Sequence, residues 1–180
     1  MLSMASPYLA CIALVSAFYH LPPRVLTSIQ TVEGGRPGMV STNTDGSADL
    51  GIMQINTRWI AALATSTGLP EGVVRNRLIN EPCFNIATAG AILRIYLNEE
   101  RGNLLRAVGN YHSHTPWRNE SYQTKVLVAA ERLFGQPPNS TISKTLNPTH
   151  KSAAAAASAQ SAGWLPSAPP ATPPPPPLPR

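Results

Sequence analysis

The sequence feature that most constrains this chain is a helical pattern that stops at an acidic residue followed by two glycines. Apolar residues, among them Ile29 and Val32, recur at helical spacing, so Glu33 falls on the last turn of a helix. Gly34-Gly35 then lets the backbone leave the helix in conformations that other residues avoid. A carboxylate at this point suits a general acid, which needs a fixed position and a partly apolar setting. On position alone, however, a glutamate at a helix end is usually a solvated surface charge.

About twenty residues further on, amide and apolar side chains alternate in an unusual run, residues 51–56 (GIMQIN). Gln54 and Asn56 stand among isoleucines and Met53, a pattern too polar for a plain core segment and too apolar for a surface loop. Amide groups donate and accept hydrogen bonds at once, which suits the acetamido and hydroxyl groups of N-acetylated sugars. The run therefore favours a sugar-binding site near Glu33.

Three motifs, in the same order, resemble those of the lytic transglycosylases with a lysozyme-like fold. Glu33-Gly34-Gly35 is similar to the family's Glu-Ser-Gly catalytic motif, residues 51–56 to its Gly-Leu-Met-Gln-Ile-Asn motif, and residues 107–113 (AVGNYHS) to its tyrosine-bearing motif. The resemblance covers roughly residues 9–135 and points to the small enzymes that accompany type III, type IV and conjugation machinery. One departure is Gly34, where the family has serine. If that hydroxyl orients the carboxylate, this chain must orient it in another way or work more slowly.

The resemblance implies a peptidoglycan lytic transglycosylase in which Glu33 protonates the leaving oxygen and then acts as a base. The 6-hydroxyl of N-acetylmuramic acid would attack C1 of the same sugar and leave a 1,6-anhydromuramyl end. One carboxylate then suffices, because an intramolecular attack has a high effective molarity. Gln54 and Asn56 would contact or support the sugar. Tyr111 would lie across the cleft, where its hydroxyl holds the carboxylate or the substrate. Met53 belongs to the same set of binding residues, although its side chain also suits the core.

Two other functions remain open on the sequence. A hydrolytic muramidase would combine Glu33 with water and a second carboxylate, Asp45 or Asp49, although both aspartates also suit turn capping. A non-catalytic module that binds peptidoglycan during assembly would tolerate Gly34 and make use of the proline-rich end of the chain.

The composition divides the chain into two parts. Hydrophobic residues make up 43% and charged residues 13%, so the part before Gln136 can bury a core, whereas 12 of the 19 prolines lie at or beyond Pro137. We expect one all-α, lysozyme-like domain over residues 1–136 and a disordered Ala/Pro-rich tail over residues 137–180. The tail would be a solvated spacer or a docking arm for a secretion or conjugation apparatus, with Trp164 as its anchor.

The net charge of +5 comes from scattered arginines, which does not favour nucleic acid as a partner. Attraction to an anionic cell-wall polymer fits better, so the expected partner is the peptidoglycan glycan strand. We expect a monomer without a cofactor. His112 and His114 alternate without a third ligand, so no metal site is expected.

Two cysteines, Cys11 and Cys83, have no second Cys and no His at metal-ligand spacing. The residues alone leave open two buried thiols or a disulfide. The resemblance favours a disulfide, because related small enzymes tie the first helix to the region before an Asn-Ile helix, and Asn85-Ile86 follows Cys83 in this way. Such a bond would stabilise the fold by about 4 kcal/mol and imply an oxidising compartment.

The apolar residues 8–18 lack the start of a signal peptide, because no Lys or Arg precedes Arg24. The segment is also too short to span a membrane, and no transmembrane span is expected elsewhere. We interpret it as the first helix, with Ser6 as N-cap and Pro7 at the first helical position. We expect a periplasmic or other cell-envelope location, reached by another export route or from a start upstream of Met1.

Helical spacing predicts most of the remaining elements, and no strand pattern of any length is present. Residues 34–50 carry turn formers and predict a long loop, or a short irregular hairpin, as one wall of a cleft. Helices are expected over about residues 7–19, 23–33, 57–64 with Thr57 as N-cap and an end at Gly68, 71–78, 85–98 after a turn at 81–83, a segment capped by Asn103 that contains Tyr111, and 120–134. One buried face is expected on the 85–98 helix, with Ile86, Ala89, Leu93 and Tyr96, and one shared face on the 120–134 helix, with Tyr122, Val126, Ala129 and Leu133.

Overall fold

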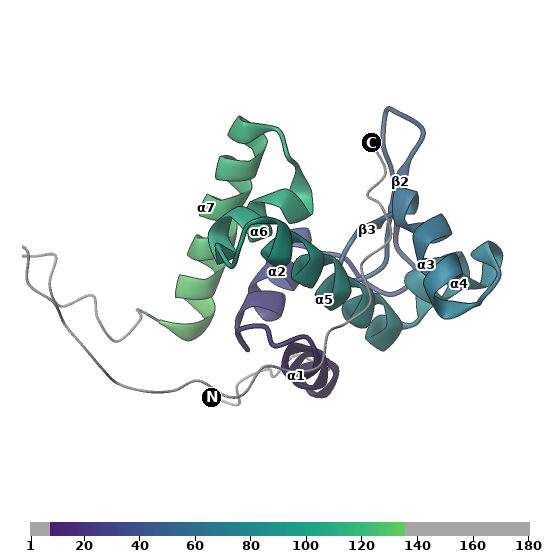
Figure 1. Cartoon of the computed structure of the whole chain (residues 1–180), viewed down its shortest axis with the longest axis horizontal. Coiled ribbons are helices and arrows are strands. Elements are labelled where there is room, and N and C mark those ends of the chain that lie inside the picture. Colours follow the sequence, from purple (N-terminus) through teal and green to yellow (C-terminus); the bar gives the residue numbers. More distant parts are fainter. Residues whose placement is uncertain (1–7, 136–180) are drawn as a thin grey trace, which may run out of the picture. The chain divides into compact units, whose positions relative to one another are not determined.

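The computed structural model describes residues 8–135, and the predictions made for Ser6, Pro7 and the 137–180 tail with Trp164 lie outside this part. The described part is mostly helical (Figure 1), which confirms the all-α, lysozyme-like class. Its elements follow in the order α1 (Leu9–Phe18), α2 (Val25–Glu33), β1 (Val40–Thr42), β2 (Ala48–Leu50), β3 (Ile55–Asn56), the 3₁₀ helix η1 (Thr57–Trp59), α3 (Ile60–Thr67), α4 (Glu71–Asn80), α5 (Pro82–Glu99), α6 (Leu104–His112) and α7 (Pro116–Phe134).

Helix α5 is the centre of the fold and packs against α1, α4 and α6, while α7 packs against α2 and α6. The predicted core face of α5 is confirmed, because Ile86, Ala89 and Leu93 are fully buried and Tyr96 nearly so. The helix begins earlier than expected. A turn was predicted at 81–83, but Pro82 occupies the first helical position, where its missing N–H has no helical partner to lose.

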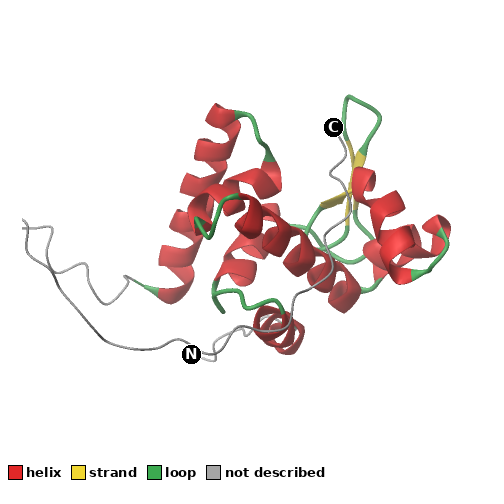
Figure 2. Ribbon diagram, viewed as in Figure 1, coloured by secondary structure: helices red, strands yellow, loops and turns green. Residues whose placement is uncertain are grey.

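A small antiparallel sheet in the order β1-β2-β3 lies on one side of the molecule (Figure 2). Val40 pairs with Leu50, and Asp49 pairs with Asn56. The expectation that the chain lacks strands was therefore wrong here, whereas the alternative of a short irregular hairpin for residues 34–50 is confirmed. Strands of two or three residues are too short to show an alternating pattern, so periodicity could not reveal them.

The run of residues 51–56 is fixed to the rest of the fold by one buried side chain, Asn85. Its Oδ1 accepts from the Met53 N–H at 2.9 Å, and its Nδ2 donates to the carbonyls of Leu50 at 2.8 Å and Leu78 at 2.7 Å. Gly51 lies against the same group with φ +69°, and a Cβ there would stand 2.2 Å from the Leu78 carbonyl oxygen. The first residue of the run must therefore be glycine.

Gly35, the last residue of the Glu33-Gly34-Gly35 motif, is needed for close packing and not for a special backbone conformation. A Cβ on Gly35 would lie 2.2 Å from the carbonyl oxygen of Gly51. Gly34 is the residue that turns the chain, because it ends α2 in the left-handed conformation with φ +61°. The two motifs found in the sequence therefore pack directly against each other.

The predicted disulfide is confirmed, and it joins α1 to the start of α5. Cys11 and Cys83 are bonded, with their Cα atoms 5.5 Å apart. Helix α1 has few other anchors, since it buries only Ile12, Val15 and Ser16. Within residues 8–135, no helix combines the length and apolar character needed to cross a bilayer.

Several predicted helix ends are confirmed, and others are corrected. Gly68 ends α3 in the left-handed conformation, and Asn103 caps α6 by accepting from the Arg106 N–H. The cap expected at Thr57 is instead Asn56, which accepts from the Arg58 N–H. An asparagine side chain reaches this donor as well as a threonine would, and Asn56 stands one residue earlier.

Helix α7 begins four residues before its predicted start because Pro116 occupies its first turn. Tyr122, Val126 and Ala129 form its buried face as predicted. Leu133 does not belong to that face, because it is 45% exposed near the end of the helix.

Replacing Asn85 with alanine should lower the free energy of unfolding by about 3 kcal/mol, because three buried backbone groups would lose their partner. Chemical denaturation followed by circular dichroism measures this change. Asn80→Ala is the matched control, because the exposed Asn80 amide bonds only to the Asn76 carbonyl within its own helix. It should change stability by less than about 0.5 kcal/mol. Equal effects of the two substitutions would show that the hydrogen bonds of Asn85 do not hold the 51–56 run in place.

Candidate active site

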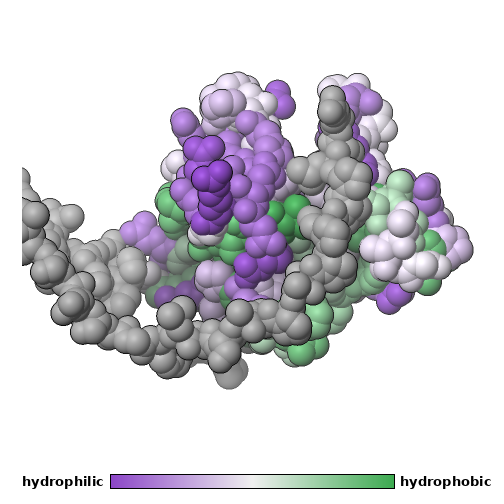
Figure 3. All heavy atoms as spheres, viewed as in Figure 1, coloured by the Kyte–Doolittle hydropathy of each residue, from purple (hydrophilic) through white to green (hydrophobic). Residues whose placement is uncertain are grey.

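A cleft of about 990 Å³ lies between the β1–β2 hairpin and the α6–α7 corner, and α5 contributes to its floor. In Figure 3 the side chains over α6 and α7 are mostly hydrophilic, as are those visible at the tip of the β1–β2 hairpin. Most of the predicted site residues line the cleft. The lining includes Glu33, Asp45, Asp49, Gln54, Asn56, Arg58, Trp59, Tyr96, Glu99, Asn110, Tyr111, His112, His114 and Arg118.

Glu33 occupies the last turn of α2, as predicted, and is partly buried in the cleft. Burial raises the pKa of its carboxyl group to about 7, and the nearby charge of Asp49 acts in the same direction. A hydrogen bond from Tyr122 and the charge of Lys125 lower the pKa, but by less. Glu33 is therefore about half protonated near neutral pH, which lets it both donate and accept a proton.

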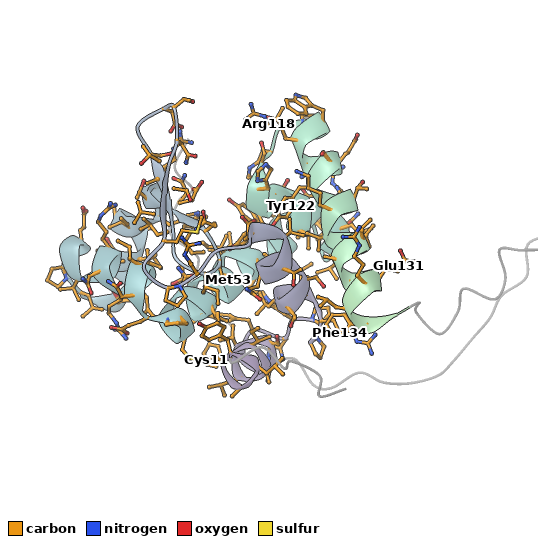
Figure 4. The ribbon with its side chains drawn as sticks, turned by 180° about the vertical axis from the view of Figure 1, so that it is seen from behind. Cys11, Met53, Arg118, Tyr122, Glu131 and Phe134 are labelled. Carbon is orange, nitrogen blue, oxygen red and sulfur yellow. A yellow bond between two sulfur atoms is a disulfide. The ribbon has the colours of Figure 1, made fainter. Side chains whose placement is uncertain are left out.

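Tyr122 orients the acid, and the sequence analysis assigned it only to the buried face of α7. Its hydroxyl donates to Oε1 of Glu33, while its ring is 3% exposed and stacks on His112 with 4.8 Å between centroids. Figure 4 shows Tyr122 pointing from α7 toward the middle of the molecule, on the side where Met53 lies. A signal was present in the sequence, because a tyrosine on a buried helix face needs a partner for its hydroxyl.

Tyr111 has a different role from the one expected for its hydroxyl. It donates to the main-chain carbonyl of Met53 at 2.9 Å, so it holds the 51–56 run and not the Glu33 carboxylate. Burial raises the pKa of Tyr111 well above its usual value, so the group stays a neutral donor. Tyr111 lines the cleft, and its contact with a substrate remains a prediction.

Met53 and Gln54 illustrate how the 51–56 run divides between core and cleft. The Met53 side chain is completely buried and is not among the cleft-lining residues, so it belongs to the core. Gln54 lines the cleft with φ +49°, and its amide bonds internally. Its Nε2 donates to the Gly51 carbonyl at 2.7 Å and its Oε1 accepts from Ser41 at 2.8 Å. Gln54 therefore shapes the wall, and direct sugar binding by it remains a prediction.

The side-chain amide of Asn56, like that of Gln54, is hydrogen-bonded to other groups of the protein. Its Nδ2 donates to Oδ1 of Asp49 at 2.8 Å and to Ser47, and its Oδ1 accepts from the Arg58 N–H. These bonds tie β2, β3 and η1 together at the cleft wall. A supporting role for Asn56 agrees with this geometry, and a contact with sugar remains a prediction.

The two aspartates of the hairpin are both held by neighbouring groups. Asp45 accepts from the backbone and hydroxyl of Ser47 and pairs with Arg58. Asp49 accepts from Asn43 at Oδ2 and from Asn56 at Oδ1. Both carboxylates are therefore part of the hydrogen-bonded wall of the cleft.

No group of three His, Cys, Asp or Glu side chains that could hold a metal ion occurs among residues 8–135. The two histidines considered in the sequence serve separate contacts. His112 stacks on Tyr122, and burial lowers its pKa, as do the charges of Lys125 and Arg118. His114 lies 3.1 Å from Glu99.

Gly34 stands where the Glu-Ser-Gly motif has serine, so this position carries no side chain that could bond to Glu33. A Cβ on Gly34 would meet no atom within 4 Å, although its φ of +61° is strained for residues other than glycine. The carboxylate of Glu33 takes its hydrogen bond from Tyr122 on α7 instead.

Comparisons with known proteins agree with this geometry. The model of the family described as Transglycosylase SLT domain matches residues 10–125. The chain is 28% identical over 144 residues to invasion protein IagB of Salmonella typhimurium strain SL1344, covering 75% of this chain and 84% of that protein. The figures for IagB of strain LT2 are the same. With IagB of Salmonella typhi it shares 28% identity over 120 residues, 64% of this chain and 69% of that protein.

Tyr122→Phe should raise the pKa of Glu33 above about 7, because it removes the hydrogen bond that stabilises the charged form. A ¹³C NMR titration of the Glu33 carboxyl carbon measures the shift. Tyr96→Phe is the control, since Tyr96 lines the same cleft and does not bond to Glu33. An unchanged or lowered pKa in Tyr122→Phe would contradict this arrangement.

Glu33→Gln should stabilise the protein at about pH 8 and leave its stability nearly unchanged at about pH 4. Between the ordinary value of 4.5 and about 7, the folded state keeps a proton that the unfolded state has released. Wild-type stability therefore falls as the pH rises through this window, whereas a neutral glutamine has no such dependence. Thermal unfolding across the pH range tests this, with the exposed Glu120→Gln as control. A Glu33→Gln variant that is less stable than wild type at high pH would refute the raised pKa.

Proposed function

The chain belongs to the family of transglycosylase SLT domains, and we propose that it is a peptidoglycan lytic transglycosylase with Glu33 as its only catalytic carboxylate. The family consists of lytic transglycosylase-type enzymes, which act on peptidoglycan in the cell envelope. The observation that carries the proposal is the position of Glu33 in the cleft, with a pKa of about 7 and a hydrogen bond from Tyr122.

In the first step, protonated Glu33 gives its proton to the oxygen of the β-1,4 bond between N-acetylmuramic acid and N-acetylglucosamine. The bond from that oxygen to C1 breaks, and positive charge develops at C1. Glu33 is then ionised, and the Tyr122 hydroxyl and the charge of Lys125 stabilise the carboxylate, since both lower its pKa.

In the second step, the 6-hydroxyl of the same muramic acid attacks C1 and gives its proton to Glu33. This forms the 1,6-anhydro ring and regenerates the acid, so that protons balance and no water is consumed. The pKa of about 7 suits both steps, because a group poised near the working pH exchanges a proton readily in either direction.

The engagement of the other cleft carboxylates supports this reaction over hydrolysis. A muramidase needs a second carboxylate as nucleophile or as base for water. Asp45 is paired with Arg58, and both oxygens of Asp49 accept hydrogen bonds from asparagine amides. Asp49 instead acts on Glu33 through its charge, which helps to keep the acid protonated.

We further propose that the protein works as a periplasmic monomer that opens the wall locally during assembly of a secretion or conjugation apparatus. The similarity to IagB, which is named an invasion protein, supports this setting, and the Cys11–Cys83 disulfide suits an oxidising compartment. The division into a catalytic domain over residues 1–136 and a tail over 137–180 that docks on the apparatus belongs to the same proposal.

The test is mass spectrometry of the muropeptides released from purified peptidoglycan. Wild type should release 1,6-anhydromuramyl products, and Glu33→Gln should reduce their yield by at least about a hundredfold, since it removes the acid and base. Glu120→Gln, which changes an exposed carboxylate of α7, is the control and should keep wild-type activity.

Reducing-end products would instead identify a muramidase and direct attention to Asp45 and Asp49. If folded wild type and Glu33→Gln both bind peptidoglycan without releasing products, the protein is a non-catalytic assembly module.

A further inference from the structure

Most of the charged side chains that line the cleft have an oppositely charged partner there. Arg58 on η1 pairs with Asp45 of the hairpin turn. Nε2 of His114 lies 3.1 Å from Oε1 of Glu99. Arg58 and Asp45 neutralise each other, and the Glu99 carboxylate has the His114 ring as its partner.

Within the described part of the chain, Asp49 and Arg118, on opposite walls of the cleft, have no oppositely charged partner at ion-pair distance. Asp49 on β2 accepts only from the neutral amides of Asn43 and Asn56. Arg118 in the first turn of α7 lines the other wall, and among residues 8–135 no carboxylate lies within ion-pair distance of it. The cleft is therefore electrostatically polar across its width, negative at the hairpin and positive at α7.

The guanidinium group of Arg118 is available to a ligand. It is exposed and stacks over the ring of its neighbour Trp117, with 5.1 Å to the ring centroid. Stacking uses the face of the planar group and leaves its N–H donors in the plane free. These donors match the two oxygens of a carboxylate, a geometry that a lysine cannot reproduce.

We infer that Arg118 binds a carboxylate of the substrate and so holds the acidic substituents of peptidoglycan against the α7 wall. This inference rests on the proposed function. The two sugars of the strand are otherwise neutral. Their negative charge lies on the lactyl group of muramic acid, when it is free, or on the stem peptide attached to it. Both sources present the same carboxylate chemistry to Arg118.

Arg118 is close to the residue that orients Glu33. It stands four residues before Tyr122 on α7, and side chains at this spacing are neighbours about 6 Å apart on one helix face (Figure 4). A carboxylate bound by Arg118 therefore lies about one helical turn from the tyrosine that bonds to Glu33.

Binding to three probes tests the subsite, measured by isothermal titration calorimetry with Glu33→Gln to prevent turnover. The probes are stem-bearing glycan strands, amidase-treated strands that keep the lactyl carboxylate, and neutral N-acetylglucosamine oligomers. Adding Arg118→Gln should weaken binding of the carboxylate-bearing strands by about tenfold and leave the neutral oligomers unchanged. Arg118→Lys should recover only part of the loss. A loss with stem-bearing strands alone assigns the site to the stem, and a loss with both assigns it to the lactyl carboxylate as well.

Arg75→Gln is the matched control, because it removes the same charge from an exposed position on α4 outside the cleft. Equal losses in Arg75→Gln and Arg118→Gln would reduce the effect to net charge and overturn the subsite. Unchanged binding of the anionic strands, or an equal loss on the neutral oligomers, would also overturn it. Failure of the proposed function looks different, because wild type would then release no muropeptides whatever residue 118 is.

Discussion

The site depends on one buried amide. Asn85 bonds with Met53, Leu50 and Leu78, and no water reaches these groups to replace it, because its side chain is fully buried. An unsatisfied backbone group in such a place is costly, so the three segments are held in a single register. Gly51 lies directly on this amide, and Gly35, two residues after Glu33, lies on Gly51. The position of Glu33 is thus set from α5, through contacts that allow no side chain between them.

Two tyrosines on the opposite wall of the cleft hold different parts of the site. Tyr111 on α6 donates to the Met53 carbonyl, so it fixes the 51–56 run, to which Asn85 is bonded through the Met53 N–H. Tyr122 on α7 holds the acid itself. The pKa of Glu33 results from opposing effects, since burial raises it and the Tyr122 hydrogen bond lowers it by less. A more exposed carboxylate would have lost its proton at neutral pH, and one buried without Tyr122 would hold it too firmly to act as a base.

Local patterns in the sequence predicted the helices, their glycine and asparagine ends, and the placement of Glu33 on a last turn, because each of these follows from neighbours within a few residues. Three features of the structure could not be predicted from such local patterns. The strands are too short to show a period, the amides of Gln54 and Asn56 are bonded inside the hairpin, and the partner of Glu33 is 89 residues away. Pairings of that kind are set by packing between helices. For the same reason the Tyr111 hydroxyl bonds to the Met53 carbonyl and not to the Glu33 carboxylate, whereas its contact with the substrate stays a prediction.

The hydrogen bond to the Glu33 carboxylate comes from α7, and Gly34 stands at the end of α2 where the motif has serine. A serine next to the acid would act from the end of α2, within the same local segment. Here the end of α2 is a left-handed glycine without a side chain, and the hydrogen bond comes from α7. Helix α7 also carries Arg118 at the cleft. Because a helix is rigid over one turn, any shift of α7 moves the acid's partner and the proposed carboxylate anchor together. The proposed substrate contact of Arg118 and the hydrogen bond that orients Glu33 therefore depend on the same helix.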